Sequence, residues 1–151
     1  MLVKRAMSKN VVSVSVPGNR EKVLDLMRKE DKAVLPVVKG DTKQLVGLIT
    51  RSDLIVNPDE EQIAILMSTD LVTASPDDDV KDVAKKMIDN NVRRVPVVDD
   101  NGDLVGIITS FDLVSNALIK LESDDPVENF MITTVPTTWY KTPLNVAFET
   151  M

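Results

Sequence analysis

The sequence predicts an α+β protein built from two β-α-β-β-α repeats that pack sheet face to sheet face with pseudo-twofold symmetry. Two observations carry this prediction: a repeat at an offset of about sixty residues, and the same succession of strand and helix patterns in each copy. A three-stranded sheet with both helices on one face leaves its other face apolar, and the second copy is the obvious partner for that face. A chain of 151 residues is long enough for one compact unit, or for two small ones that share a core.

The repeat is visible in short apolar phrases. Met7-Ser8 recurs sixty positions later as Met67-Ser68, and the phrase of residues 36–38 recurs as residues 96–98. The offset then falls to fifty-nine, because the polar connector "KGDTKQ" of the first copy is one residue longer than its counterpart "DDNGD" in the second. An insertion confined to a turn is typical of a duplicated domain, since loops tolerate changes in length.

Each copy has the same order of elements, introduced by a short helix. A short extended piece comes first and a long helix follows it. In the second copy, the apolar residues of this helix recur at helical spacing: Val80, Val83, Ala84, Met87 and Ile88. Two strands joined by a tight turn come next, over residues 94–98 and 104–109, and a closing helix runs from about residue 110 to residue 119. In the first copy the closing helix is shorter, because Asn57-Pro58 interrupts it.

A third copy begins after the second. Met131 falls where Met67 stood, and four further apolar residues match the long helix of the second repeat: Leu144, Ala147, Phe148 and Met151. We therefore divide the chain into a first repeat (1–60), a second repeat (61–122), and a linker with the truncated start of a third repeat (123–151). This predicts that the chain is the N-terminal part of a longer, four-repeat protein; the alternative is a C-terminal arm that matches by coincidence.

Composition excludes several classes of function. The net charge of −6 and the low aromatic content (3%) argue against a nucleic-acid partner, which needs clustered Lys and Arg and stacking surfaces. The chain has no Cys and no His, so it lacks thiolate chemistry, the commonest general base and the commonest transition-metal ligand. Neither a signal peptide nor a membrane span is recognisable. We expect a cytoplasmic protein that is not an enzyme and has no membrane partner.

The strongest candidate for a functional motif occurs twice. "GLITRSD" (residues 47–53) and "GIITSFD" (residues 106–112) both read Gly-x-x-Thr-x-x-Asp where a strand runs into a helix. One interpretation is structural: the Thr caps the helix, and the acid three residues later lies near the positive helix end. The other is functional, since helix N–H groups and a Thr hydroxyl can hold a phosphate, and a carboxylate can accept hydrogen bonds from a ribose diol.

The two motifs lie among further paired phrases, the strands "VLPVV" and "RVPVV" and the strands "LVGLIT" and "LVGIIT". With them, residues from about 5 to 118 resemble a tandem pair of CBS domains, the arrangement called a Bateman module. The chain is also similar to four-repeat CBS proteins related to the gamma subunit of AMP-activated protein kinase. The resemblance implies that an adenine nucleotide (AMP, ADP or ATP) or S-adenosylmethionine binds in clefts between the paired domains, with no cofactor required.

The same resemblance implies site residues in both motifs. The ribose hydroxyls would be held by Asp53 and Asp112, and the phosphate would be faced by Thr50 and Thr109. A hydroxyl-bearing strand residue early in each copy, with its neighbour, would lie beside the base: Ser13 and Val14, and Thr73 and Ala74.

One copy carries charges that the other lacks. "NVRRVPVV" places Arg93 and Arg94 before the strand, where the first copy has Ala33 and Val34. By resemblance, the arginines would reach across the pseudo-twofold axis to a phosphate held by the first motif, with which guanidinium groups make paired hydrogen bonds. The cleft of the second motif would face Lys32, Ala33 and Val34 and lose the arginine charge. The alternative is that both arginines are edge charges whose stems cover apolar surface.

Two acidic clusters have structural interpretations. Residues 77–79, three consecutive Asp, stand at the start of a helix, where capping and the helix dipole favour acids over a metal site. The "DDNGD" connector lacks the acid spacing of a calcium loop and is typical of a hairpin turn.

Three classes of function remain. A regulatory module that senses adenine nucleotides would act by binding two arrangements of the protein with different affinity, and the arginine asymmetry favours it. The alternatives are a module that binds S-adenosylmethionine and a dimerisation scaffold without a ligand. An enzyme is disfavoured, because the sequence shows no pairing of a nucleophile with a base. The expected partners are the adenosyl ligand and either further CBS repeats or a second copy of the chain.

Overall fold

The computed structural model describes residues 1–118 continuously, and beyond them residues 126, 131, 133, 135, 137, 139, 141–143 and 146. Residues 1–120 form one compact unit, and residues 121–151 form another. Of the residues assigned to a third copy, Met131 is described and is exposed. The other four lie outside the described residues: Leu144, Ala147, Phe148 and Met151.

The first repeat forms a three-stranded sheet with the order β1-β2-β3. Strand β1 runs parallel to β2, and β2 runs antiparallel to β3. The elements follow the predicted order: β1 (Val14–Val16), α1 (Arg20–Lys29), β2 (Val34–Lys39), β3 (Leu45–Thr50) and α2 (Arg51–Val56). Helix α2 ends directly before Asn57-Pro58, as predicted.

The second repeat has the same order, with its first strand shortened. Its elements are α4 (Val80–Asp89), β4 (Arg94–Val98), β5 (Leu104–Thr109) and α5 (Ser110–Leu118). Strands β4 and β5 are antiparallel, and a single parallel bridge between Ala74 and Val97 replaces β1. The ladder ends there because Pro76 has no backbone N–H to donate. The preceding N–H, of Ser75, is donated to the Asp78 carboxylate.

Both long helices have an N-cap and an apolar face. The side chain of Asn19 accepts a hydrogen bond from the backbone N–H of Glu21 in α1, and Asp79 accepts one from Lys81 in α4. The apolar face of each helix is buried against its sheet through Val23 and Met27 in α1, and through Val83 and Met87 in α4. In the part of the chain that the structure describes, no helix is long and apolar enough to cross a bilayer.

Helix α4 exposes one residue that the helical pattern assigned to its apolar face. Ile88 is 79% exposed, so this part of the prediction is wrong. Eight residues after Val80 an α-helix has turned about 80° past it, which carries Ile88 off the sheet. It lines an open groove between α4 and α5, together with Met87 and Val114.

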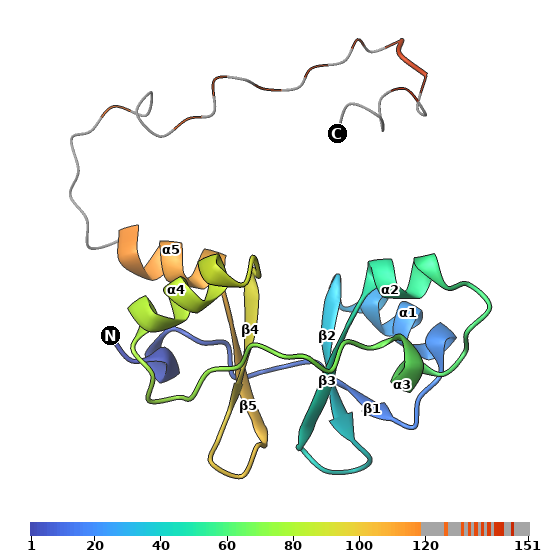
Figure 1. Ribbon diagram of the computed structural model, residues 1–151, viewed down its shortest axis with the longest axis horizontal. Coiled ribbons are helices and arrows are strands. Elements are labelled where there is room, and N and C mark those ends of the chain that lie inside the picture. Colours follow the sequence, from blue (N-terminus) through green and yellow to red (C-terminus); the bar gives the residue numbers. More distant parts are fainter. Residues whose placement is uncertain are drawn as a thin grey trace. The chain divides into compact units, whose positions relative to one another are not determined.

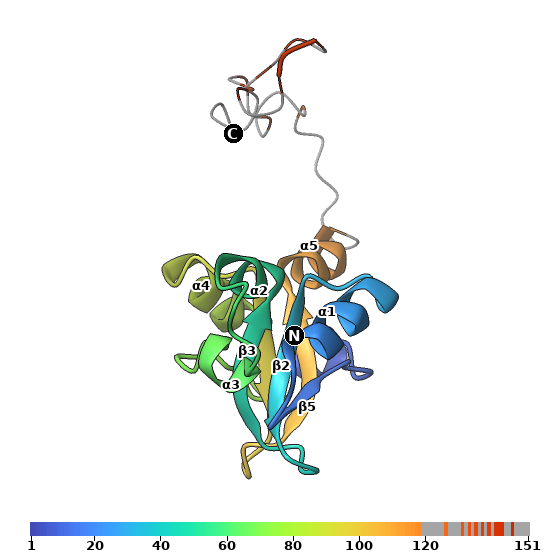
Figure 2. The ribbon, with the colours of Figure 1, turned by 90° about the vertical axis from the view of Figure 1, so that its right-hand side faces the viewer.

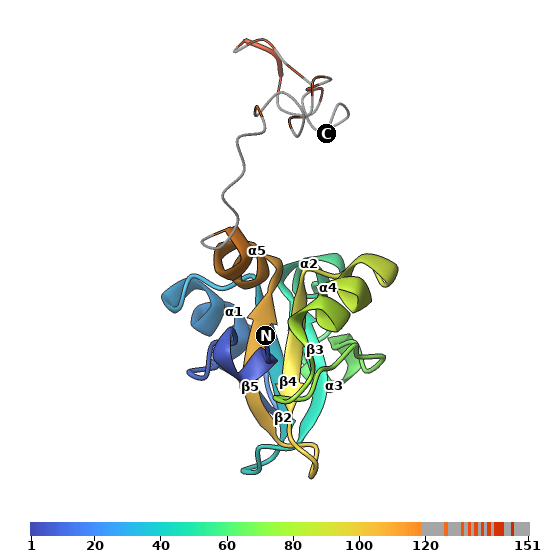
Figure 3. The same ribbon diagram turned by 90° about the vertical axis from the view of Figure 1, so that its left-hand side faces the viewer.

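The two sheets face each other, and the helices cover their outer faces. Figure 1 shows α1 and α2 outside the sheet of the first repeat, and α4 and α5 outside the sheet of the second. Figure 2 views this arrangement from the side of the first repeat, and Figure 3 from the side of the second. The architecture is the predicted pair of repeats packed sheet face to sheet face.

The short helix that precedes each repeat packs on the other repeat. The 3-10 helix η1 (Val3–Arg5) precedes the first repeat, but Val3 is fully buried in the core of the second. Helix α3 (Ile63–Leu66) precedes the second repeat, and Ile63 is fully buried in the core of the first. The chain therefore crosses between the repeats twice, and each repeat lacks part of its core without the other.

Two methionines in these crossing segments account for two glycines in the motifs. A Cβ added at Gly106 would lie 2.5 Å from Sδ of Met7 and 3.1 Å from the carbonyl oxygen of Ser8. A Cβ at Gly47 would lie 2.5 Å from Sδ of Met67. Only glycine leaves room for the crossing chain at these positions. The methionine of each recurring Met-Ser phrase thus packs against the glycine that begins one of the two motifs.

The two hairpin turns also meet. The backbone N–H of Leu45 donates to the carbonyl of Gly102 (3.1 Å), and the N–H of Leu104 donates to the carbonyl of Lys43 (2.8 Å). Gly102 has a φ of +81°, a backbone conformation that favours glycine, and it stands in the "DDNGD" connector. This connector is a hairpin turn, as predicted.

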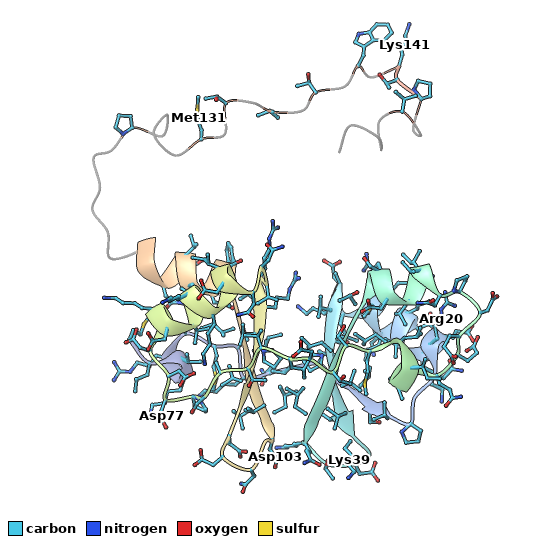
Figure 4. The ribbon with its side chains drawn as sticks, in the orientation of Figure 1. Arg20, Lys39, Asp77, Asp103, Met131 and Lys141 are labelled. Atoms are coloured by element: carbon cyan, nitrogen blue, oxygen red, sulfur yellow. The ribbon has the colours of Figure 1, made fainter. Side chains whose placement is uncertain are left out.

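The three consecutive acids before α4 fix the chain around the start of that helix. Asp79 is the N-cap, Asp77 accepts from Lys4 Nζ at 2.6 Å, and Asp78 accepts from Lys86 Nζ at 3.1 Å. Figure 4 shows Asp77 at the periphery of the second repeat. Partial burial raises the pKa of Asp78, but the N–H of Ser75 and the Lys86 ammonium outweigh it and leave this pKa below its ordinary value of 3.8.

The contact between Gly106 and Met7 predicts a coupled loss of stability. Gly106→Ala should lower the free energy of unfolding by about 1–3 kcal/mol, because the new methyl group overlaps the methionine. Met7→Ala should cost less in the Gly106→Ala background than in the wild type, since the second change removes the overlap. Urea denaturation of the four proteins measures this coupling, and strictly additive effects would contradict it.

The lowered pKa of Asp78 predicts a pH-dependent effect of Asp78→Asn. The carboxylate stabilises the fold above its ordinary pKa, and this contribution is lost as the pH falls through the folded value. The pair with Lys86 is partly exposed, so the effect should not exceed about 1 kcal/mol. Chemical denaturation should show the variant less stable at about pH 7 and equal to the wild type at about pH 2. A difference that does not change with pH would indicate another cause.

Candidate functional site

The second motif lies in a cavity between the two repeats, which we call the Thr109 cleft. Its volume is about 320 Å³. Thr109 and Asp112 line it from the junction of β5 and α5, and residues 31–36 line it from the start of β2 in the first repeat. The remaining lining comes from the crossing segment and from the second sheet: Ser8, Asn10, Val11, Val12, Arg94 and Ile107.

Both motifs form capping boxes. Asp112 Oδ2 accepts hydrogen bonds from the backbone N–H of Thr109 (2.8 Å) and from its hydroxyl (2.6 Å), and the hydroxyl accepts from the backbone N–H of Asp112 (3.1 Å). Thr50 and Asp53 repeat this geometry at 2.8, 2.7 and 3.2 Å. The structural interpretation of the motif is therefore confirmed for both copies.

The capping box leaves part of each carboxylate available. In each box the carboxylate accepts only through Oδ2, and Oδ1 of Asp53 and of Asp112 accepts no hydrogen bond from the described residues. Both side chains are half-buried. A carboxylate whose orientation is fixed by its own helix start can present a free oxygen to a ligand hydroxyl without rearranging. Capping and ligand binding are thus compatible uses of the same residues.

The position of Arg94 differs from what we expected for the Thr109 cleft. We expected this cleft to face Lys32, Ala33 and Val34 without an arginine, and these three residues do line it. Arg94 lines it as well, so the expected loss of the arginine charge is wrong. The cause is strand register: Arg94 is the direct neighbour of Thr109 in the β4–β5 ladder. The cleft therefore combines two cations, Lys32 and Arg94, with two carboxylates, Asp31 and the motif's Asp112.

Arg93 lies at a different surface feature. It lines the outer groove between α4 and α5 together with Ile88 and Ser110, and its carbonyl accepts from the backbone N–H of Ser110 (2.9 Å). Successive residues of an extended segment point to opposite sides, so the two adjacent arginines face different surroundings. Both side chains are exposed, and neither forms an ion pair with a described residue.

The residues expected beside a base are dispersed. Ser13 and Val14 line a cavity of about 660 Å³ at the outer edge of β1, and Ser13 also lines a third cavity near the hairpin turns. Ala74 is 3% exposed and belongs to the core of the second repeat. The carbonyl of Thr73 accepts from Lys86 Nζ at 3.4 Å. None of these four residues lines the Thr109 cleft.

Residues 10–12 of the crossing segment line the Thr109 cleft instead. We did not predict them, because they precede the strand and carry no motif of their own. The available signal was the Met7-Ser8 phrase, since the crossing it marks brings the next few residues between the sheets. Figure 4 shows side chains from both sheets meeting along this central region.

The chemistry of the Thr109 cleft is that of a binding site. Asp112 can accept hydrogen bonds from ligand hydroxyls, and Lys32 and Arg94 can neutralise an anionic group. Apolar side chains line the rest and can cover a flat ring: Val11, Val12, Val34, Leu35 and Ile107. The Thr109 hydroxyl does donate to the Asp112 carboxylate, but this bond is part of the capping box, in which the same hydroxyl accepts from the backbone N–H of Asp112. In the described part of the chain no cluster of acids could hold a metal ion.

Comparison with known proteins gives relatives of several lengths. The MK0525 protein of Methanopyrus kandleri is 36% identical over 85 residues, and the chain spans only 43% of its length. The MJ1426 protein of Methanocaldococcus jannaschii is 32% identical over 152 residues, which is 76% of this chain and 89% of the relative. Inosine-5'-monophosphate dehydrogenase of Nitrosopumilus maritimus is 35% identical over 120 residues, 76% of this chain but 24% of the enzyme. The match to the enzyme thus covers only a small part of it.

Three solved structures share the fold. The CBS domain pair of protein MJ0100, in complex with 5-methylthioadenosine and S-adenosyl-L-methionine, has a TM-score of 0.72 and 32% identity, covering 80% of this chain and 98% of that one. The cytosolic domain of the Mg²⁺ channel MgtE, in complex with ATP, has a TM-score of 0.66 and 31% identity over 73% and 46% of the two chains. Protein MJ1225 of M. jannaschii, with a TM-score of 0.80 and 20% identity over 89% and 56%, shares the fold.

A family model settles the relationship for nearly all of the first compact unit. The model of the CBS domain matches twice in tandem, over residues 3–59 and 61–118. The two matches contain one Gly-x-x-Thr-x-x-Asp motif each, and their order is that of the two repeats in the structure. The chain therefore belongs to the CBS domain family, as a tandem pair of CBS domains.

Proposed function

We propose that this chain is a regulatory module that senses an adenine nucleotide (AMP, ADP or ATP) in the Thr109 cleft. The observation that carries the proposal is the meeting, in one cavity between the repeats, of the Asp112 carboxylate with two cations, Lys32 and Arg94. The carboxylate and the cations come from three different segments. Only the paired fold brings them together.

Each part of a nucleotide has a counterpart in the cleft. The free Oδ1 of Asp112 accepts from the ribose hydroxyls, and Thr109 with the start of α5 faces the phosphate side. Arg94 donates paired hydrogen bonds to the phosphate, and Lys32 adds a second positive charge. The adenine ring lies against the apolar lining near residues 10–12.

The charged lining of this cleft balances, with Lys32 and Arg94 against Asp31 and Asp112, so the preference between nucleotide and S-adenosylmethionine rests on which of these groups meets the ligand. S-adenosylmethionine carries a positive sulfonium group, which two nearby cations repel, whereas a phosphate is attracted. Among the similar structures, the MJ0100 pair is solved with S-adenosyl-L-methionine and the MgtE domain with ATP, so both ligand classes occur on this fold. The Arg94 guanidinium, which can pair with a phosphate, favours the ATP-like class for this chain.

A second site at Thr50 and Asp53 is also proposed. Its capping box has the same geometry and the same free Oδ1. By the pseudo-twofold relation, the segment that would face it is residues 91–96, the counterpart of residues 31–36 in the Thr109 cleft. That segment contains Arg93 and Arg94, so we retain both arginines as candidate phosphate ligands for the first motif.

A ligand between the repeats acts on how they pack. Each repeat contributes to both the cleft and its partner's core, so a nucleotide that bridges them stabilises one arrangement over another by its difference in affinity. The change is passed to other repeats or to a second copy of the chain. In the competing proposal the chain is a scaffold: the repeats pack in the same way, and no ligand binds between them.

Isothermal titration with AMP, ADP, ATP and S-adenosylmethionine tests the proposal. We expect micromolar binding of at least one nucleotide, weakened roughly tenfold or more by Arg94→Ala and by Asp112→Asn, because each change removes charge-assisted hydrogen bonds. Asp112→Asn keeps an acceptor for the capping box. Arg28→Ala removes an exposed arginine outside the cleft and should leave binding unchanged. Titrations without heat for all four ligands, repeated by equilibrium dialysis, would favour the scaffold.

We further propose that a second copy of the chain packs on the groove between α4 and α5. Three apolar side chains of α4 and α5 are largely exposed: Ile88 by 79%, Phe111 by 75% and Val114 by 52%. Ile88 and Val114 line the groove with Ala84, Met87 and Leu113, and Phe111 precedes Val114 by about one turn of α5. Exposed apolar side chains gathered on one surface are characteristic of association sites.

Phe111→Glu should therefore shift the mass measured by light scattering toward the monomer, because a charge is placed one helical turn from Val114, beside the apolar groove. Ser52→Glu is the matched control, since Ser52 is the counterpart of Phe111 in the first repeat and is already exposed. A wild-type chain that is monomeric at high concentration, or a control variant that dissociates equally, would contradict the assignment of this groove.

A further inference from the structure

We propose a second ligand site, for a small phosphate-bearing molecule, in a cavity that we call the lysine cavity. It has a volume of about 440 Å³ and is lined by residues 9–13, Val38, Thr42, Lys43 and Leu104. Its size falls within the range of roughly 300–1,000 Å³ typical of small-molecule sites. The site is separate from the proposed nucleotide function and does not depend on it.

The lysine cavity and the Thr109 cleft lie toward opposite ends of β2. The cleft is lined by the start of this strand, residues 34–36, whereas the cavity is lined by Val38 and by the turn that follows. Residues 10–12 form a wall that both share. Neither Thr109 nor Asp112 lines the lysine cavity, so a ligand there would not use the second motif.

The charge of the lysine cavity is uniformly positive. Lys9 and Lys43 line it and no acidic residue does, although the whole chain carries a net charge of −6. Neither ammonium group forms an ion pair with a described residue. The carboxylates nearest along the chain, Asp41 and Asp103, belong to the two turns and do not line the cavity. Two unpaired cations beside one cavity attract an anion.

The turn that carries Lys43 is fixed by the fold. The hydroxyl of Thr42 donates to the carbonyl of Lys39 (2.6 Å) and accepts from the N–H of Gln44 (3.2 Å). The carbonyl of Lys43 accepts from Leu104 of the other hairpin at 2.8 Å. The backbone from which the ammonium group extends is therefore held on both sides, and less conformational entropy is lost when a ligand binds.

Two further polar groups are available for hydrogen bonds. The side chains of Asn10 and Ser13 line the cavity and make no hydrogen bond to a described residue. With the two ammonium groups they supply four polar groups around one cavity, beside an apolar wall: Val11, Val12, Val38 and Leu104. Ammonium groups act as point charges that do not require the planar geometry of a carboxylate. A compact phosphate group, with several acceptor oxygens, matches this set of donors.

The other half of the duplicated fold lacks these charges. The carbonyl groups of Lys43 and Gly102 accept equivalent bonds, from Leu104 and from Leu45, so these two positions correspond. At an offset of sixty, Lys9 corresponds to Thr69. Both repeats have the same backbone arrangement here, but the two cations, Lys9 and Lys43, occur only in the first repeat. Backbone packing does not require them, because the counterpart is built from a threonine and a glycine.

Inorganic pyrophosphate is the probe for the test, followed by amide shifts in a ¹⁵N-labelled sample at constant ionic strength. We expect saturable shifts at Ser13, Thr42 and Lys43. The affinity obtained from these three shifts should fall at least tenfold in the double variant Lys9→Gln/Lys43→Gln. The control, Lys29→Gln/Lys85→Gln, removes the same charge from two exposed helix positions and should bind as the wild type does.

Three results would overturn the proposal. An absence of saturable shifts would mean that the lysines are only solvated charges. An equal loss of affinity in the control variant would show that net charge, and not the cavity, attracts the probe. Shifts centred on Thr109 and abolished by Arg94→Ala would place the probe in the Thr109 cleft instead. The four lysines are exposed, so the variants are expected to fold, and the spectrum of each verifies this directly.

Discussion

The exchange of leading segments between the repeats is the contact on which the rest of this fold depends. Val3 completes the core of the second repeat and Ile63 that of the first, so neither half is a self-sufficient unit. The crossing chains pass close enough to β3 and β5 that only glycine fits, at Gly47 and Gly106. Because the same crossings carry residues 10–12 between the sheets, the packing that holds the repeats together also forms a wall of both central cavities.

The two motifs show how one arrangement can serve both stability and the proposed binding. Oδ2 of Asp112 receives the hydrogen bonds that begin α5, and this fixes the direction of the whole carboxylate. The remaining oxygen is then held in place before any ligand arrives, so the entropy of ordering the side chain has already been lost in folding. The choice between a capping and a binding function is therefore not exclusive.

Much of this fold is predictable from the sequence, because the signals are local and occur twice. The strands at residues 94–98 and 104–109 have the predicted bounds, and α2 ends at the Asn57-Pro58 interruption. The misses are of two kinds. Ile88 shows that apolar spacing alone extends a helical face too far, and Pro76 shows that one missing N–H replaces a strand with a single bridge.

The candidate site was harder to predict because it depends on register and on long-range crossing. Arg94 joins the Thr109 cleft through its pairing with Thr109 in a ladder, and residues 10–12 join it through a segment that packs on the opposite repeat. Neither the strand pairing nor the packing on the opposite repeat has a local sequence motif that predicts it. The two capping acids, Asp53 and Asp112, could be located because capping chemistry constrains their spacing, whereas the cations follow no such spacing.

Differences between the two copies locate function more sharply than their similarities do. A feature present in both halves, such as the capping box, is accounted for by folding alone. A charge present in only one half is not accounted for by folding alone, because the other half folds with an uncharged residue at the corresponding position. Val34 corresponds to Arg94, and Thr69 corresponds to Lys9. Exposed cations beside a cavity add nothing to the core, and repulsion between them costs stability. Their placement at the two central cavities of an acidic chain is the observation on which both ligand proposals rest.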